Sequence, residues 1–189
     1  MMDLLIVGLV LFFSVHIVST IPPIKRKFSL LVGQKGYKPV YAIISLIGFV
    51  LIVMGYADKP ILAMPQWSTP SWAVHLMYLI LWLAIILQPA SHMPTNIKRY
   101  TRHPMLWGVV LWSAMHLWVN ADRASILLFG SFLAYSLWAM FTANLAGAKK
   151  QTKKVPMKHD VLVVVVGTFA YILVLFAHKW IAGVPLVNY

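Results

Sequence analysis

Most of the sequence consists of long apolar runs that contain few or no charged residues. Hydrophobic residues make up 61% of the 189-residue chain and charged residues only 11%, whereas about 25% charged residues are usual in a soluble domain. An apolar run of about 20 residues can cross the roughly 30 Å hydrocarbon core of a bilayer as a helix. The apolar–polar alternation of a membrane β-barrel is absent. The chain is therefore expected to be an all-α integral membrane protein that contacts the lipid bilayer along most of its length.

Prolines and charged residues divide the apolar sequence into six predicted spans, which gives a bundle of about six transmembrane helices. Pro22-Pro23 is predicted to end the first span and Pro89 the third, because proline interrupts the hydrogen bonding of a helix interior. The first span begins with Asp3 and lacks the basic start and cleavage site of a signal peptide, so it is expected to be a retained helix. The predicted spans cover residues 2–21, 38–56, 70–88, 103–120, 124–143 and 160–183.

The positive charges are concentrated in three of the segments between these spans. The formal net charge is +12, which in a soluble protein would suggest nucleic-acid binding. Basic residues also mark cytoplasmic loops, so we expect no nucleic-acid partner and both termini outside. Thirteen of the 16 basic residues lie in these segments, namely Lys25, Arg26, Lys27, Lys35, Lys38, Lys98, Arg99, Arg102, Lys149, Lys150, Lys153, Lys154 and Lys158. The other side receives Asp3, Asp58, Lys59, Asp122, Arg123 and Lys179.

The side chains available for chemistry are few. Cysteine is absent, as is glutamate, and the four acidic residues are all aspartates, so thiol chemistry is excluded and acid–base chemistry is limited. Histidine occurs seven times, and an ionisable residue inside a membrane span is a candidate functional residue. The histidines are therefore the main candidate functional residues, and the sequence assigns no catalytic residue.

Three histidines are predicted to lie in one layer near the outer ends of their spans. His75, His116 and His178 each lie four or five residues from a span end, which corresponds to roughly 6–8 Å. They are candidate ligands of a metal or haem, because imidazole is a common ligand of both. The alternative is that they are separate interfacial histidines within an aromatic belt. The tryptophans predicted at that level are Trp67, Trp72, Trp118 and Trp180.

His16 and His103 are placed near the opposite, inner surface. His103 and His116 are 13 residues apart on one predicted helix, or roughly 20 Å, so they cannot bind one metal ion together. His16 starts a polar stripe with Ser19 and Thr20, which indicates either ligation or a small-polar contact between helices.

The sequence Arg102-His103-Pro104-Met105-Leu106-Trp107-Gly108 resembles a signature of the NnrU family. The resemblance continues through Trp112, His116, Asn120 and Asp122, and upstream it includes His16, Gly33, Tyr37 and Gly55-Tyr56. It implies a single transmembrane domain over residues 1–189, in a bacterial inner-membrane protein associated with nitrite and nitric-oxide reduction. It further implies haem b as a cofactor, because the family includes the plant zeta-carotene isomerase, a haem-dependent membrane enzyme.

By that analogy His16 and His116 are metal ligands of a haem, and His103 is needed nearby. The isomerases have a cysteine three residues before the second histidine, where this chain has Ser113. The predicted depths also place His16 and His116 about 12 Å apart along the membrane normal, whereas two axial ligands must face each other across one iron. His75 or His178 is geometrically the easier partner for His116.

Three functions are compatible with these features. The first is a haem-b protein of nitric-oxide or nitrite metabolism. The second is a haem-dependent cis-trans isomerase, for which the bundle would hold an apolar small molecule such as a polyene. The third is a membrane methyltransferase, whose Arg-His-Pro-x-x-x-Gly motif is similar but which carries glutamates that this chain lacks.

The motif residues also have purely structural interpretations. Arg102 and His103 would anchor a helix at the headgroups, and Gly108 would allow close helix packing. Asn120 and Asp122 would cap the helix ends at the tight turn between the fourth and fifth spans.

Overall fold

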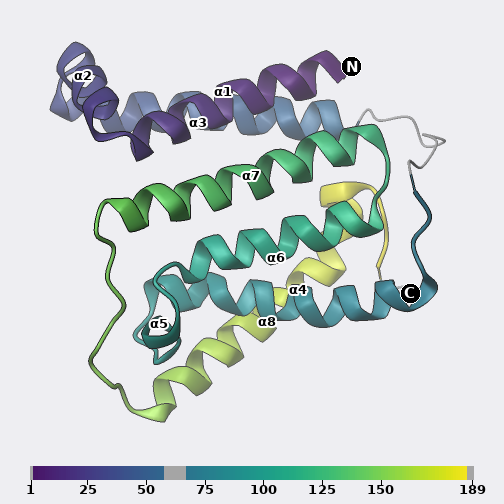
Figure 1. Ribbon diagram of the computed structural model, residues 1–189. Helices are drawn as coiled ribbons and strands as arrows, with labels where there is room; N and C mark the ends of the chain where they lie inside the picture. Colours follow the sequence, from purple (N-terminus) through teal and green to yellow (C-terminus); the bar gives the residue numbers. More distant parts are fainter. Residues whose placement is uncertain (1, 58–66, 187–189) are drawn as a thin grey trace.

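The protein is an assembly of helices in the computed structural model, which describes residues 2–57 and 67–186 (Figure 1). These two ranges contain no β-strand, so the predicted all-α fold is confirmed. The helices are α1 (Met2–Thr20), α2 (Pro22–Val32), α3 (Gln34–Ala57), α4 (Ser71–His92), α5 (Ile97–Tyr100), α6 (Pro104–Val119), α7 (Arg123–Leu145) and α8 (Met157–Ala182).

Five helices are long and apolar enough to cross a membrane, namely α1, α3, α4, α7 and α8. The predicted fourth span corresponds to α6, which has 16 residues and is therefore about 24 Å long at 1.5 Å per residue. Pro104 begins this helix and Asn120 is its C-cap. The predicted number of six spans is therefore approximate, because α6 is shorter than a typical spanning helix.

Two predictions based on prolines were wrong. The sequence predicts that Pro89 ends the third span, but α4 continues to His92. Proline removes only its own N–H bond, and the N–H of Met93 donates to the carbonyl of Pro89 at 2.9 Å to close another turn. The sequence also predicts a loop after Pro22-Pro23, whereas these prolines occupy the first turn of α2, where no N–H donor is needed.

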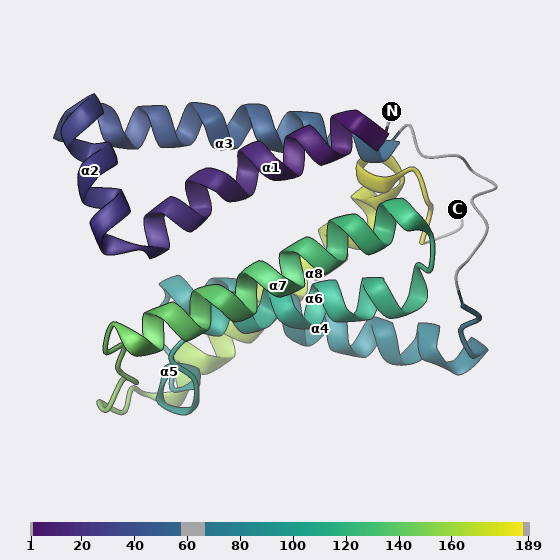
Figure 2. The same ribbon diagram turned by 45° about the horizontal axis from the view of Figure 1, so that its top comes forward.

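The helices lie side by side in the order α3, α1, α7, α6, α4 and α8. Figures 1 and 2 show α1 and α3 as a close pair, set against a second group that contains α4, α6, α7 and α8. Helix α7 contacts both α1 and α6. It therefore joins the two groups and faces both His16 and His116.

The two ends of this assembly differ in charge. Helix α2, the region 97–102 and residues 146–156 all lie at one end, which we call the basic end (Figure 1). The start of α1 and the end of α8 lie at the opposite end. The predicted grouping of the basic segments is therefore confirmed for the described residues. Asp58 and Lys59, predicted at the opposite end, lie outside the described residues.

The buried apolar core lies mainly between α1, α3 and α7, where Leu5, Phe13, Ile52 and Phe129 pack together. By contrast, most of the apolar surface of α8 is exposed, as at Phe169, which is 63% exposed. An exposed apolar surface of this extent is expected to be covered by lipid in a membrane-spanning helix.

Candidate functional site

His116 lies in the last turn of α6 inside an aromatic cluster. Only 8% of its surface is exposed. Its ring stacks on Phe129 of α7, with a centroid distance of 4.7 Å and an interplanar angle of 27°, and Trp112 lies 5.3 Å away. The imidazole is therefore held in a fixed orientation between α6 and α7 and is largely shielded from solvent.

His16 lies one turn from the end of α1, also among aromatic rings. It stacks on Phe12 at 4.1 Å and lies 5.2 Å from Tyr41 of α3 and 5.7 Å from Tyr135 of α7. In the predicted polar stripe that follows, Thr20 accepts a hydrogen bond from the indole N–H of Trp138 at 3.2 Å. Part of the stripe thus makes a contact between α1 and α7.

The hydrogen bonds fix which ring nitrogen of each histidine carries the proton. The Nδ1 atom of His16 lies 2.6 Å from the carbonyl of Phe12, and that of His116 lies 2.8 Å from the carbonyl of Trp112. A carbonyl oxygen can only accept, so Nδ1 carries the proton and donates, while Nε2 of the neutral ring keeps its lone pair. A metal-ligating histidine is commonly held by this kind of bond.

His16 and His116 do not face one another across a single site. His116 stacks on Phe129, whereas His16 lies beside Tyr135, and six residues correspond to about 9 Å along α7. Between them, Phe132 packs against both Phe12 and Trp112, at 5.6 and 5.4 Å. This arrangement matches the two depths expected from the sequence and does not suit two axial ligands of one iron.

The other two histidines of the predicted outer layer differ in their surroundings. His75 of α4 is exposed, whereas His178 of α8 is half-buried and its Nδ1 donates to the carbonyl of Val184 at 2.8 Å. Within residues 2–57 and 67–186, no three side chains of His, Cys, Asp or Glu form a metal-binding cluster.

The predicted aromatic belt is present at the end of the molecule opposite the basic end. The indole N–H of Trp67 donates to the carbonyl of Trp118 at 2.9 Å. The rings of Trp72 and Trp118 meet edge to face at 5.6 Å. Trp180 is 75% exposed.

Arg102 and His103 lie at the basic end, far from His116, and share one partner. Arg102 Nη1 donates to Asn144 Oδ1 at 3.0 Å, and His103 Nε2 lies 3.0 Å from the same oxygen. Arginine can only donate, so the atom between them is the amide oxygen and His103 Nε2 is protonated. Asn144 of α7 thereby connects the Arg-His motif to the last turn of its neighbouring helix.

The remaining motif residues have the packing and capping roles that the sequence indicates as their structural interpretation. Pro104 begins α6, and a Cβ added to Gly108 would lie 2.6 Å from the carbonyl oxygen of Ala84, so only glycine allows this approach of α6 to α4. Trp112 packs against Phe129 at 5.0 Å. Asn120 is the C-cap of α6, and its N–H donates to the carbonyl of His116 at 2.8 Å.

Asp122 is the N-cap of α7, as the sequence predicts. Its carboxylate accepts hydrogen bonds from the N–H of Ser125 at 3.0 Å and from the Ser125 hydroxyl at 2.6 Å. Ser125 is fully buried and lies 3.0 Å from the hydroxyl of Tyr56 in α3. Tyr56 and the Asp122 cap, which the resemblance includes separately, therefore meet in one hydrogen-bonded group.

Sequence reasoning missed the most extensive polar cluster of the described chain. Asp160 in the first turn of α8 accepts from the Thr95 hydroxyl at 2.6 Å and from the backbone and side-chain nitrogens of Asn96 at 2.7 and 2.6 Å. Asn96 also bonds both backbone groups of Val155. The sequence Pro94-Thr95-Asn96 indicates a turn, but it does not indicate the partner of that turn, because Asp160 lies 65 residues from Thr95.

Comparison with known proteins identifies one family. The family model described as NnrU protein matches residues 4–186, which confirms the resemblance expected from the sequence. No curated protein and no solved structure gives a significant match.

Proposed function

The chain belongs to the NnrU family, and from this premise we propose that it is a haem-b-binding membrane protein that acts in nitric-oxide or nitrite reduction. The observation that carries the proposal is the state of His116. Its ring is buried, and its Nδ1 proton is held by the carbonyl of Trp112, so the Nε2 lone pair is available to a metal.

The surroundings of His116 support a role as the residue that would hold a haem. Phe129 covers one face of the ring, but a metal approaches in the plane of an imidazole along the Nε2 lone pair, so face stacking does not oppose coordination. Phe129 and Trp112 would exclude water and lower the local dielectric, which tunes a bound haem. When bound, haem would supply the redox chemistry.

The other histidines would take secondary roles in this proposal. His178 is the better candidate for a second group near the metal, because it is the other half-buried histidine of the predicted outer layer, whereas His16 lies about two turns along α7 from His116. His16 would serve a separate position among Phe12, Tyr41 and Tyr135. His103 and His75 would not touch the metal.

The proposed location is the bacterial inner membrane, with the basic end in the cytoplasm and both termini in the periplasm. The positive-inside rule supports this orientation, because the basic segments share one end. The exposed apolar surface would contact lipid, and an apolar small molecule could approach from the same side.

The isomerase alternative gains no support, since the position of its cysteine is held by Ser113, which is buried and donates to the carbonyl of Val109 at 2.6 Å.

An absorption spectrum of the protein purified in detergent, after expression with ample haem, tests the proposal. We expect a Soret band in the wild-type protein and haem retention that is weaker by about tenfold or more in His116→Ala. His75→Ala is the matched control, because His75 lies in the same predicted layer but is exposed. It should leave the spectrum unchanged.

Two results would contradict the proposal. A wild-type protein without a Soret band would exclude haem binding under these conditions of haem supply. An intact Soret band in a folded His116→Ala variant would show that another residue holds the iron.

A further inference from the structure

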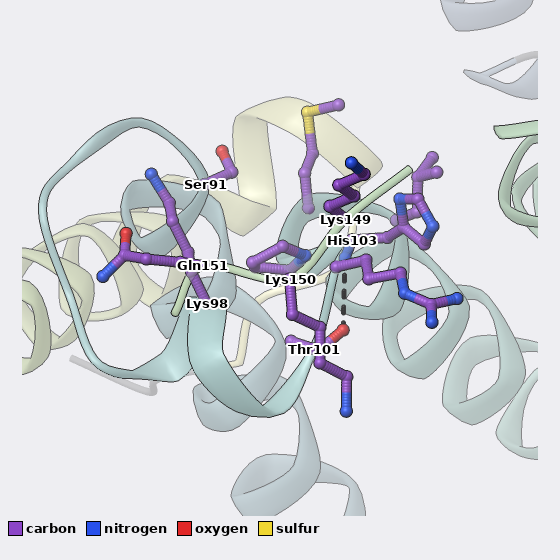
Figure 3. A pocket seen from close by; sticks show the side chains of 11 residues that line it. Ser91, Lys98, Thr101, His103, Lys149, Lys150 and Gln151 are labelled. Carbon is purple, nitrogen blue, oxygen red and sulfur yellow. Dashed lines mark hydrogen bonds between the residues drawn. The ribbon is translucent and has the colours of Figure 1, made fainter. Parts of the chain in front are cut away.

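The basic end contains a cavity of about 470 Å³. It lies at the junction of α5, the first turn of α6 and the segment that follows α7. Figure 3 shows Lys98, Lys149, Lys150 and His103 around it, and Arg102 completes the lining cations. Four positively charged side chains from two segments distant in sequence, residues 98–102 and 149–150, thus surround one space.

This positive charge has no counter-charge within the cavity. None of the residues that line it is acidic. The carboxylate of Asp160 belongs to the neighbouring surface and already accepts hydrogen bonds from Thr95 and Asn96. Like charges repel one another, so an anion in the cavity would stabilise this grouping.

The lining groups are positioned by other parts of the fold. Asn144 accepts from Arg102 at 3.0 Å, which uses one of the five guanidinium N–H donors and leaves the others for a ligand. The N–H of Gln151 donates to the carbonyl of Lys98 at 3.1 Å, which ties the segment after α7 to α5. Thr101 adds a hydroxyl, whose oxygen accepts from the N–H of His103 at 3.2 Å (Figure 3).

The first turn of α6 adds a further attraction for anions. Met105 and Leu106 line the cavity together with Pro104, which has no N–H. The first N–H groups of a helix lack intrahelical partners and carry partial positive charge. A tetrahedral oxyanion accepts hydrogen bonds from guanidinium, ammonium, hydroxyl and backbone N–H groups together. The cavity offers donors of all four kinds.

We infer that this cavity binds a phosphoryl group through Lys98, Arg102, Lys149 and Lys150. The group would belong either to an anionic phospholipid headgroup or to a free phosphate compound. Basic pockets at the ends of membrane helices bind lipid headgroups in this way. The site is separate from the proposed haem ligand, because His116 lies at the opposite end of α6 from His103.

The test uses the full-length protein and two probes. In the first arm, the protein is purified in nanodiscs of phosphatidylcholine with or without phosphatidylglycerol, and native mass spectrometry counts the retained anionic lipids. In the second arm, inorganic pyrophosphate is titrated in neutral detergent while the melting temperature is followed, because a ligand of the folded state raises it.

The matched variants remove equal charge from the same end of the molecule. Lys149→Gln with Lys150→Gln changes the cavity, whereas Lys153→Gln with Lys158→Gln changes exposed lysines that do not line it. We expect the first pair to weaken binding by about tenfold or more, since hydrogen bonds to charged groups are lost. The second pair should change binding less than about twofold, the effect of general surface charge alone.

Each outcome decides the inference. Selective retention of phosphatidylglycerol identifies the lipid headgroup, and a pyrophosphate response alone identifies a free phosphate compound. If the two variant pairs weaken binding equally, or if the wild-type protein responds to neither probe, the inferred phosphoryl site is wrong. If the cavity pair does not purify as a single species, Lys98→Gln provides the same comparison from α5.

Discussion

The hydroxyl of Thr95 is the residue-scale contact that fixes the start of α8. Thr95 is fully buried, donates to Asp160 at 2.6 Å and accepts from the N–H of Ile97 at 3.2 Å. A buried hydroxyl with both partners satisfied stabilises the fold, because its removal leaves polar groups unpaired. The turn between α4 and α5 is thereby attached to a helix distant in sequence.

We predict that Thr95→Val lowers the free energy of unfolding by about 1–2 kcal/mol. This value is below the full range for hydrogen bonds to charged groups, because Asp160 is partly exposed to solvent. Thr152→Val is the control, since Thr152 is exposed at the same end, and it should change stability by less than about 0.5 kcal/mol. The measurement is the midpoint of SDS-induced unfolding in mixed micelles, followed by circular dichroism. Equal midpoints for the two variants would refute the role of Thr95.

Some residue-scale features follow directly from the sequence and others do not. The Asp122 cap was predictable because its partner Ser125 is three residues away, and local capping depends on local sequence. Asn144 was not, because its contact with Arg102 spans 42 residues and asparagine near a helix end has many ordinary roles. The protonation of His116 required knowledge of which carbonyl its ring meets.

At the scale of elements, glycines set the distance between α1 and α3. Gly8 and Gly48 lie opposite each other across this pair. A Cβ added to Gly48 would lie 2.7 Å from the backbone nitrogen of Phe12, and one added to Gly8 would lie 2.6 Å from that of Ile52. Backbone atoms cannot move aside singly, so a side chain at either position would push the helices apart.

We predict that Gly48→Ala destabilises the protein by about 1–3 kcal/mol, the usual cost of overpacking. Gly130→Ala is the matched control, because an added Cβ at Gly130 of α7 meets nothing within 4 Å. Alanine should there be neutral or stabilising by up to about 1 kcal/mol, since it favours the helix. Thermal unfolding in detergent compares the two, and a stable Gly48→Ala protein would show that α1 and α3 can separate without cost.

The helices themselves were largely predictable, whereas their ends were less so. Apolar length located five helices that are long enough to cross a membrane, because the bilayer fixes how long such a run must be. The remaining predicted span corresponds to the shorter helix α6. Helix α2 was missed because a proline pair was interpreted only as a stop, although proline is equally suited to a first turn. The order α3, α1, α7, α6, α4, α8 depends on long-range packing, which no local pattern records.

At the scale of the whole molecule, the distribution of charge and the arrangement of helices agree. The basic segments gather at one end and the start of α1 lies at the other (Figure 1). The short helix α6 is the critical element of this topology, because it must carry the chain from the basic end to the opposite end. Its 16 residues give about 24 Å, so its crossing depends on the flanking residues lying in the headgroup regions.

The absence of cysteine from the chain allows this topology to be tested without background labelling. Tyr100→Cys places a thiol at an exposed position of α5, before α6, and Arg123→Cys places one at an exposed position after it. We predict that a membrane-impermeant maleimide labels Arg123→Cys in intact spheroplasts and labels Tyr100→Cys only after permeabilisation, because the positive-inside rule places the basic end in the cytoplasm. The reverse pattern would retain the crossing but invert the orientation. Labelling of both thiols from the same side would mean that α6 does not cross the bilayer, and the two ends of the molecule would then need to be reassigned.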